Sequence, residues 1–394
     1  MLKNEIKELA KSIYPEVIEN RRYLHANPEL SFEEFNTSKF IKSKLDDLGI
    51  SYESMADTGI VALIEGNKPS TNIVALRADM DALPITEVDG REYGSKNPGV
   101  MHACGYDVHS SSLLGAAKIL NSLKDQFGGT VKLIFQPAEE KLPGGASIMI
   151  KEGVLENPVP QAVIGQHVMP LIEAGKVGFR SGKYMASSDE LYVRIIGQGG
   201  HAAQPQQNID PIIITAHIIT ALQQIVSRIA DPKMPTVLSF GKIVAEGATN
   251  VIPNEVYLQG TFRTFDEEWR KVAHEKMKKM AEGMAESMGA TCEFEIRSGY
   301  PFLVNEEKLT ASVRSYAEDY VGKENVEDLD IWLAAEDFAY YSQIADSCFY
   351  RLGTGNISKG ITSAVHTPTF DVDESALELS TGLMAYLTIK QLGN

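Results

Sequence analysis

The chain has 394 residues, which is long for one hydrophobic core and predicts two domains. The hydrophobic content of 43% and the charged content of 23% are those of a globular protein, whereas the net charge of -16 argues against nucleic acid or an anionic membrane as a partner. We expect no secretory signal, and we expect that no window of the sequence approaches the roughly 18 apolar residues of a membrane span. The three cysteines are few and far apart, which indicates a reducing compartment, so we expect a cytoplasmic protein.

The first part of the chain alternates helical and strand-like patterns. Helical periodicity predicts three helices, over 3–26, 38–48 and 110–123. A kink or break is expected at Pro15. Four apolar runs have the length of strands, namely 60–65, 73–76, 131–135 and 162–165. This alternation predicts an α/β domain with a largely parallel sheet flanked by helices.

Charged or polar side chains follow several of these strand-like runs. Asp79, Glu139, Glu140 and His167 each come just after such a run. In parallel sheets, ligands bind at the carboxyl ends of the strands. The order of the chain therefore predicts that these four side chains gather at one edge of the sheet.

The pattern changes near residue 185. Strands and helices then follow in a β-α-β-β-α-β order, over 190–196, 211–229, 237–244, 256–262, 266–288 and 292–296. This order indicates a separate α+β sandwich inserted into the first domain. We predict one domain from residues 1–184 plus 298–394, which ends in a helix near 374–392, and an inserted domain over 185–297.

The predicted helix over 211–229 is apolar nearly all round. A helix that covers a small sandwich is expected to leave one face to water. Burial on both sides therefore predicts a subunit interface, with a deeply buried core helix as the alternative.

Four segments carry cysteine, histidine or carboxylate side chains, which hold zinc-like metals. They are 102–109, which contains Cys104, then 136–140, 165–167 and 365–368. A lone buried histidine is more often a satisfied core residue than a ligand. The joint presence of the four segments instead predicts a metal centre.

Glu139 and Glu140 are adjacent on an extended segment, so their side chains point in opposite directions. One of them can bind a metal while the other faces a reacting water. A metal lowers the pKa of bound water to about 7, and a nearby carboxylate can take the proton and pass it to a leaving amine. This division predicts metal-assisted amide hydrolysis, with Cys104 as a ligand in preference to a nucleophile.

Ordered motifs run along nearly the whole chain. They are His25 with 27–31, then 76–84, 102–109, 136–140, 199–203, 250–253 and 336–338, and His366 with 370–374. In these motifs the chain resembles the metal-dependent amidohydrolases and peptidases that include hippurate hydrolases, N-acyl-L-amino acid amidohydrolases, N-acetyldiaminopimelate deacetylase and indole-acetyl-amino-acid hydrolases. The resemblance implies that the first domain is catalytic and that the inserted domain is the dimerisation or lid domain of a homodimer.

The resemblance also implies a centre of two divalent ions, zinc or manganese being usual in the group. The ligand positions, by motif match, are Cys104, Glu140, His167 and His366. Glu139 matches the general base. Asp79 is a further catalytic candidate and, like Asp107, matches a group that orients the ligands.

The resemblance assigns three residues of the inserted domain to the substrate, a small N-acyl amino acid. His201 matches a histidine that stabilises the developing oxyanion, often from the partner subunit. Asn250 and Arg263 suit the substrate carboxylate, Arg263 through its planar guanidinium. A surface or strand role for Arg263 is the alternative.

Tyr106 stands where the group has a histidine ligand. A phenol has an ordinary pKa of about 10 and is a weak ligand unless the metal ionises it. Three outcomes are open. Tyr106 could bind metal as a phenolate. The first ion could be lost, which would leave one ion on Glu140 and His167, with Cys104 as a further ligand. The chain could also be an inactive relative.

Two functions are compatible with these patterns. The first is a hydrolase that removes the acyl group from small N-acyl amino acids by metal-activated water, with Glu139 as the base. The second is a binding protein of the same fold, impaired in catalysis because Tyr106 leaves a mononuclear or absent metal site. We expect the hydrolase, because a remaining ion can still act as a Lewis acid.

Overall fold

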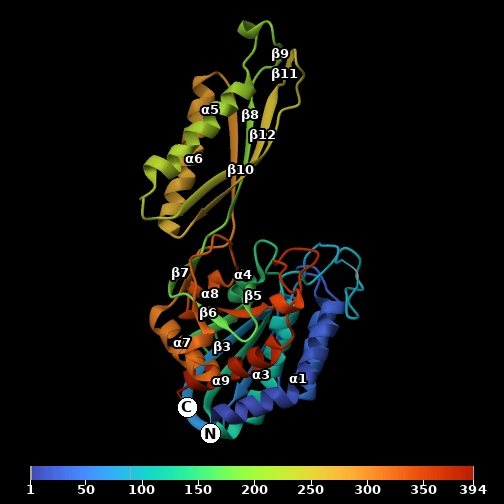
Figure 1. Ribbon diagram of the computed structural model, residues 1–394. Helices are drawn as coiled ribbons and strands as arrows, with labels where there is room; N and C mark the ends of the chain where they lie inside the picture. The colour runs from blue at the N-terminus through green and yellow to red at the C-terminus, as the bar shows by residue number, and fades with distance from the viewer. Residues whose placement is uncertain (1, 89, 394) are drawn as a thin grey trace. The chain divides into compact units, whose positions relative to one another are not determined.

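The computed structural model describes residues 2–88 and 90–393, and the chain divides into two compact units (Figure 1). The first unit comprises Met1–Tyr184, Val304–Ile331 and Asp337–Asn394, and the second comprises Met185–Leu303 and Trp332–Glu336. The second unit is therefore inserted into the first. Two short strands, β7 (Gly182–Met185) and β14 (Leu303–Asn305), lie where the chain passes from one unit to the other.

A mixed eight-stranded sheet forms the centre of the first unit. Its strands are β1 (Tyr52–Met55), β2 (Gly59–Glu65), β3 (Lys68–Asp79), β4 (Gly128–Gln136), β5 (Ala162–Glu173), β6 (Val177–Phe179), β15 (Val326–Asp328) and β16 (Ser347–Gly355). Their order is β1-β2-β4-β3-β5-β16-β6-β15. The central pairs β4–β3, β3–β5 and β5–β16 are parallel, as is β6–β15, and the other pairs are antiparallel. The predicted α/β fold with a largely parallel sheet is confirmed.

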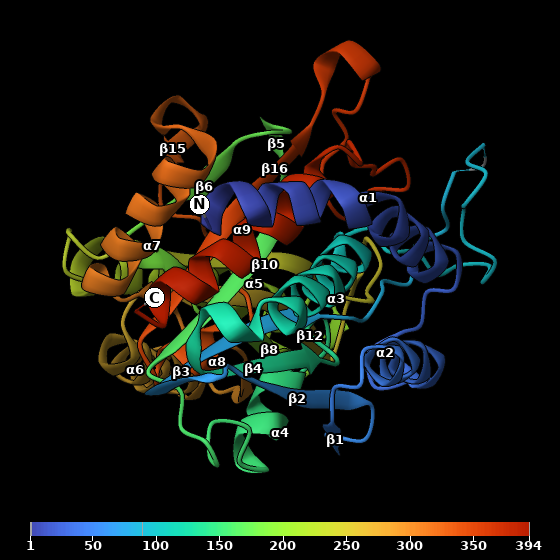
Figure 2. The ribbon, with the colours of Figure 1, turned by 90° about the horizontal axis from the view of Figure 1, so that it is seen from below.

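Three long helices pack against one another over one face of this sheet (Figure 2). They are α1 (Leu2–Ala26), α3 (Tyr106–Ser122) and α9 (Ala376–Gln391). The helix α1 continues through Pro15, so the predicted break does not occur. Ala10 and Val17 are buried on either side of Pro15, and their packing helps to offset the roughly 3 kcal/mol that an interior proline costs a helix.

The remaining α-helices described in the first unit are shorter. They are α2 (Phe35–Asp47), α4 (Gly145–Lys151), α7 (Glu307–Val321) and α8 (Ala339–Ser342). The helices α4 and α8 contact each other and lie on the face of the sheet opposite α3 and α9 (Figure 1). Both faces are thus covered, which explains why strand residues such as Leu76, Leu133 and Ile164 are buried.

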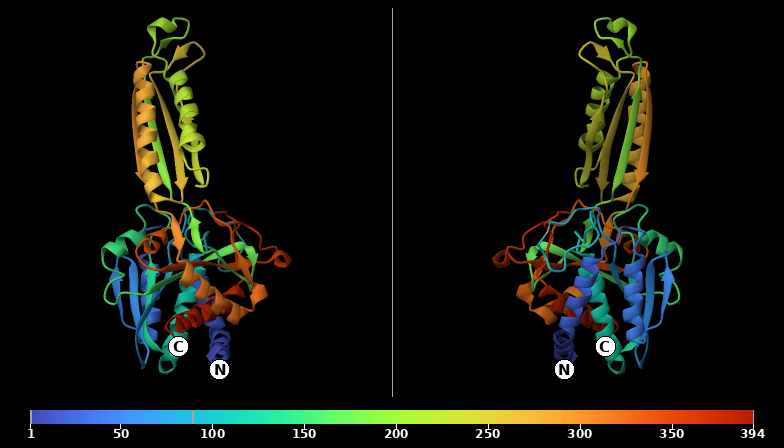
Figure 3. Two further views of the ribbon diagram at one scale, coloured as in Figure 1. Left: turned by 90° about the vertical axis from the view of Figure 1, so that its left-hand side faces the viewer. Right: turned by 90° about the vertical axis from the view of Figure 1, so that its right-hand side faces the viewer.

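The second unit is an α+β sandwich. Its main elements follow the order β8 (Asp189–Ile196), α5 (Pro211–Gln224), β10 (Thr236–Val244), β12 (Glu255–Thr264), α6 (Glu267–Ser287) and β13 (Thr291–Ser298). The strands form an antiparallel sheet in the order β10-β12-β8-β13, and α5 and α6 contact each other on one face of it (Figure 3). The predicted β-α-β-β-α-β order is confirmed, whereas a role in dimerisation or closure stays a prediction.

The helix α5 has an apolar face that the chain itself does not cover. The residues that pack on the sheet are Ile214, Ile218 and Leu222. Ile212 and Ile213, by contrast, are 42% and 53% exposed, which contradicts a helix buried on all sides. With its π-helical continuation Ile225–Ile229, the helix is long and apolar enough to cross a membrane by length and composition alone. The expectation that no segment meets that criterion is therefore wrong, although core and interface helices also meet it.

Candidate metal centre

Gly105 sets the direction of the chain between Cys104 and the start of α3. Its φ is +86°, a left-handed conformation that side chains disfavour. A Cβ at this position would also lie 2.5 Å from Cγ2 of Val168. Only glycine therefore allows the turn that places Cys104 just before the helix and Tyr106 in its first turn.

Three of the four predicted ligands form a compact group. Nε2 of His366 lies 3.2 Å from Sγ of Cys104 and 3.2 Å from Oε1 of Glu140. One donor atom from each residue lies within 4.8 Å of the other two. A thiol, a carboxylate and an imidazole at this spacing are a suitable donor set for a zinc-like divalent ion.

The fourth predicted ligand, His167, joins this group through Cys104. Its Nε2 lies 3.4 Å from Sγ of Cys104, while its Nδ1 donates a hydrogen bond to the carbonyl of Val168 at 2.7 Å. A carbonyl can only accept, so Nδ1 carries the proton and Nε2 presents a lone pair. Such a backbone hydrogen bond is the usual way to orient a ligand histidine. One of the alternatives left open by the sequence, a single ion on Glu140 and His167 with Cys104 as a further ligand, thus differs from the compact group, which contains His366.

The directions in which the pKa values of the group are shifted are also compatible with a cation site. Burial raises the pKa of the Cys104 thiol well above its ordinary value, and the carboxylates of Glu140 and Glu139 raise it further. Burial lowers the pKa of His167, and the hydrogen bond to Glu140 raises the pKa of His366. A divalent cation would counter the effect on Cys104, because it stabilises the thiolate.

Two residues of the centre have strained backbones. His366 has a φ of +61° and Ala138, which precedes Glu139, has a φ of +50°. Left-handed conformations of non-glycine residues cost roughly 1–3 kcal/mol and persist where the surroundings enforce them. The backbone N–H of His366 donates to the carbonyl of Ala103 at 2.7 Å, which ties this residue to the segment of Cys104.

Hydrogen bonds to both carboxylate oxygens orient the side chain of Glu139. The hydroxyl of Tyr106 donates to Oε2 of Glu139 at 2.6 Å, and the backbone N–H of Asp337 donates to Oε1 at 3.2 Å. The same hydroxyl lies 3.1 Å from Oε1 of Glu140. Burial raises the pKa of the Tyr106 phenol well above its ordinary value. Tyr106 therefore contacts both adjacent glutamates.

Asp81 was missed as a functional candidate, although it holds both glutamates through their backbones. Its Oδ1 accepts the N–H of Glu139 at 2.9 Å and its Oδ2 accepts the N–H of Glu140 at 3.0 Å. The hydroxyl of Ser31 also donates to Oδ2, at 2.6 Å. Burial raises the pKa of Asp81 well above its ordinary value, and Glu140 adds to this effect. Charged residues at alternate positions 77, 79 and 81 at the end of an apolar strand were the available signal.

Asp79 lies beneath the centre and contacts none of the four predicted ligands. Its Oδ1 accepts from Nδ1 of His109 at 2.5 Å, and its Oδ2 accepts from Arg77 at 2.5 Å. Burial alone would raise the pKa of Asp79, but Arg77 and His109 outweigh it and lower the pKa. Nε2 of His109 in turn accepts the backbone N–H of Val168 at 2.9 Å, beside His167. The ring of His109 thus links Asp79 to the backbone of Val168, next to the candidate ligand His167.

Asp107 also has partners other than the ligands that it was expected to orient. Its Oδ2 accepts from Nε of Arg21 at 2.8 Å and from Nδ1 of His25 at 2.9 Å. Nε2 of His25 lies 3.1 Å from Oε1 of Glu87. Burial would raise the pKa of Asp107, but Arg21 and His25 lower it far below its ordinary value. The side chain of Asp107 therefore anchors α3 to α1.

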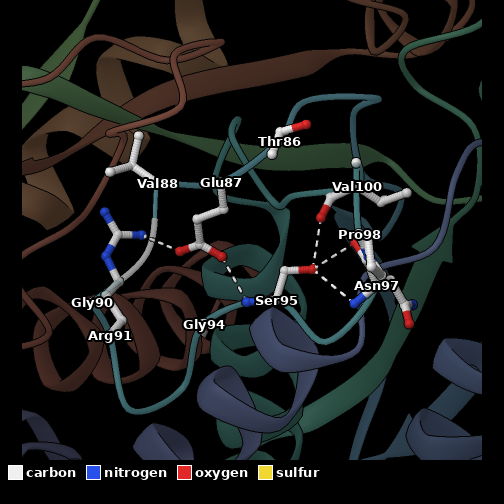
Figure 4. Close-up of a pocket in the computed structure, with 11 residues that line it drawn as sticks. Thr86, Glu87, Val88, Gly90, Arg91, Gly94, Ser95, Asn97, Pro98 and Val100 are labelled. Carbon is white, nitrogen blue, oxygen red and sulfur yellow. Dashed lines mark hydrogen bonds and ion pairs between the residues drawn. The ribbon is translucent and has the colours of Figure 1, made fainter.

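The loop between β3 and α3 encloses a pocket of about 300 Å³ (Figure 4). Glu87 in its wall accepts from Arg91 at 2.8 Å and from the N–H of Ser95 at 2.6 Å. The hydroxyl of Ser95 donates to the carbonyl of Val100 at 2.7 Å. The described residues that line the pocket lie within 86–88 and 90–100, and none of them is a candidate ligand.

The remaining candidates, His201, Asn250 and Arg263, lie in the second unit. The strands β9 (Gly200–His201) and β11 (Val251–Ile252) pair there, and the carbonyl of Asn250 accepts the N–H of Ala202 at 3.0 Å. His201 and Asn250 are thus neighbours at this small, exposed two-stranded sheet. Arg263 lies elsewhere, on β12, and its Nε donates to the hydroxyl of Thr261 at 3.1 Å.

Comparison with known proteins agrees with this chemistry. The model of peptidase family M20/M25/M40 matches residues 75–390. An N-acyl-L-amino acid amidohydrolase of Geobacillus stearothermophilus is 46% identical over 306 residues, which are 77% of this chain and 82% of that protein. An N-acetyl-L-cysteine deacetylase of Bacillus subtilis is 41% identical over 94% of this chain and 87% of its own length.

Solved structures extend the similarity to the whole fold. An aminohydrolase from methicillin-resistant Staphylococcus aureus has a TM-score of 0.91 at 35% identity and covers 99% of this chain and 100% of its own. The YXEP protein of Bacillus subtilis, described as a dinuclear metal binding peptidase, has a TM-score of 0.82 at 34% identity and covers 97% of this chain and 99% of its own.

Proposed function

Because the chain belongs to peptidase family M20/M25/M40, we propose that it hydrolyses the amide bond of small N-acyl amino acids with the help of a divalent metal. The observation that carries the proposal is the compact group of Cys104, Glu140 and His366 beside a second, buried carboxylate, Glu139. This arrangement combines ligands for a cation with a base that is not itself in the ligand group. No feature of residues 2–88 and 90–393 favours the alternative, an impaired binding protein.

The residues that would hold the metal are Cys104, Glu140 and His366, with His167 next to Cys104. A divalent ion bound there would polarise the amide carbonyl and acidify water. Zinc suits the thiolate and imidazole donors, and manganese is the second candidate.

Glu139 acts as the general base in this proposal. It takes a proton from the attacking water and passes it to the leaving amine, a role worth about 10²–10⁴ in rate. Tyr106 and the N–H of Asp337 hold one carboxylate oxygen each, which fixes the orientation of the group. Asp81 fixes the backbone that carries it.

The second unit supplies the residues that recognise the substrate. His201 stabilises the oxyanion, and Asn250 and Arg263 bind the substrate carboxylate. Two glycines support the geometry of the two-stranded sheet that carries His201, because a Cβ at Gly199 would lie 2.3 Å from the carbonyl oxygen of Ile252 and one at Gly200 would lie 2.2 Å from Oδ1 of Asn208. Arg263 is partly buried, and its planar guanidinium can donate two parallel hydrogen bonds to a carboxylate.

We further propose a cytoplasmic homodimer that associates through the exposed face of α5. Ile212 and Ile213 leave apolar surface uncovered there, which a second copy would bury. The cysteines Cys104, Cys292 and Cys348 are all free, as expected in a reducing compartment.

The substitution Glu139→Gln tests the base. It keeps the size of the side chain but removes the basic oxygen, so kcat for an N-acetyl or N-benzoyl amino acid is expected to fall by about 10²–10⁴ while the metal content stays unchanged. The matched control is Glu33→Gln on an exposed loop position, which should keep wild-type activity. Wild-type kcat in the Glu139 variant would disprove the assignment.

A further inference from the structure

The Tyr106 hydroxyl is enclosed by side chains that bind cations. It donates to Glu139 at 2.6 Å, lies 3.1 Å from Glu140 and is hydrogen-bonded to Cys104 as well. The ring is 2% exposed and packs edge-on against His167 at a centroid distance of 5.8 Å. The hydroxyl therefore occupies the space between a thiol and two carboxylates, where a cation would otherwise neutralise their charge.

A second ion shared by Cys104 and His167 would lack a third ligand, because the nearby Tyr106 donates its hydroxyl proton to Glu139. The described residues contain one other group of possible ligands, Glu139, Glu336 and Asp337, and its Asp337 is already paired with Arg77 at 2.6 Å. Protein-bound zinc usually has at least three protein ligands. The Bacillus subtilis relative described as dinuclear shows that this fold can hold two ions.

We propose that this centre binds one divalent ion, on Cys104, Glu140 and His366, and that the Tyr106 hydroxyl takes the place of a second ion. The inference rests on the proposed function, since it concerns the same metal site. In this arrangement the Tyr106 hydroxyl, in place of a cation, lies between the base Glu139 and the ligand Glu140. Tyr106 is thus a positioning residue for Glu139.

Metal stoichiometry tests the proposal without reference to activity. The full chain is stripped with a chelator and dialysed to equilibrium against Zn²⁺ and, separately, against Mn²⁺, and the bound metal is measured by mass spectrometry. We expect one ion per chain in the wild type and in Tyr106→Phe, which lacks the hydroxyl but gains no ligand. Tyr106→His should bind two ions, because the imidazole completes a second site with Cys104 and His167.

Two ions per wild-type chain would overturn the inference and leave the hydrolase proposal intact. A single ion in a folded Tyr106→His would also overturn it. The absence of any bound ion would instead refute the metal-dependent function itself.

Discussion

Charged side chains near the candidate metal centre are buried together, and one such group links α1 to α3, the helix that begins two residues after Cys104. Arg21 and Asp107 have side chains that are fully buried and lie 2.8 Å apart, with His25 as a third member. Glu374 lies 3.3 Å from Arg21 at the edge of the group. A buried pair adds little net stability compared with apolar packing, but removing one partner leaves an uncompensated charge.

We predict that Asp107→Asn lowers the free energy of unfolding by about 3 kcal/mol, at the lower end of the range for a broken buried pair because Glu374 remains near Arg21. Urea unfolding at pH 7 measures this loss. The control is Asp319→Asn, which removes an exposed pair with Lys3 and should cost no more than about 1 kcal/mol. Equal losses in the two variants would contradict a buried charge network at Asp107.

The same variant has a defined pH dependence. The pKa of Asp107 in the folded chain is far below its ordinary value, so the carboxylate is stabilised by folding above the unfolded pKa of about 4. This contribution is lost as the pH falls below about 4, because the unfolded chain then takes up the proton. The difference in unfolding free energy between wild type and Asp107→Asn should therefore shrink from pH 5 to pH 3, and a constant difference would contradict the assignment.

The candidate ligands could be selected from residue type and motif, whereas their supporting contacts could not. Cys104, Glu140 and His366 come from distant segments and lie close together, in line with the motif match. Asp81 was missed because it acts through backbone N–H groups, which leave no pattern of residue types. The bridge made by Tyr106 was missed because the direction of a side chain depends on the three-dimensional surroundings.

At the level of elements, the sequence predicts most helices and strands but misplaces some ends. The helix α3 begins at Tyr106, four residues before the predicted start at 110. Its first turn contains Asp107 and His109, which are polar but fully buried, because Arg21 and Asp79 satisfy them. Apolar periodicity cannot mark such a turn. The start of α3, next to Cys104, is therefore an end that apolar periodicity does not mark.

The turn at Gly105 leads to a prediction about the element that it starts. In Gly105→Ala, the new Cβ would meet the buried, β-branched Val168 and adopt an unfavourable φ. Gly49→Ala is the matched control, since its φ is +64° but nothing lies within 4 Å. We expect Gly105→Ala to cost at least about 1 kcal/mol more in unfolding free energy than the control and to weaken Zn²⁺ binding. Equal effects of both substitutions would mean that the contact with Val168 is unimportant.

At the level of the whole molecule, the chain combines an α/β unit that carries the candidate metal ligands with an inserted α+β unit that carries His201, Asn250 and Arg263. The order of strands and helices in each unit could be predicted, because hydrophobic periodicity changes at the insertion. The oligomeric state could not be predicted in this way, because an apolar helix can face a core, a partner or a membrane.

A substitution on the exposed face of α5 tests whether the chain forms a dimer. We expect Ile213→Lys to convert a dimer into a monomer, because it places a charge in an apolar interface. Sedimentation velocity measures the change. Val159→Lys is the control, because Val159 is 64% exposed in the first unit and lies outside the proposed interface. A wild type that sediments as a monomer would exclude the homodimer.

The most direct test of the account is steady-state hydrolysis of N-acetyl and N-benzoyl amino acids by the wild-type chain, before and after chelation. We predict that the metal-loaded chain turns over, that a chelator abolishes hydrolysis, and that Zn²⁺ or Mn²⁺ restores it. Hydrolysis that persists after complete metal removal, or tight binding of these compounds by the loaded chain without turnover, would contradict a metal-dependent amidohydrolase.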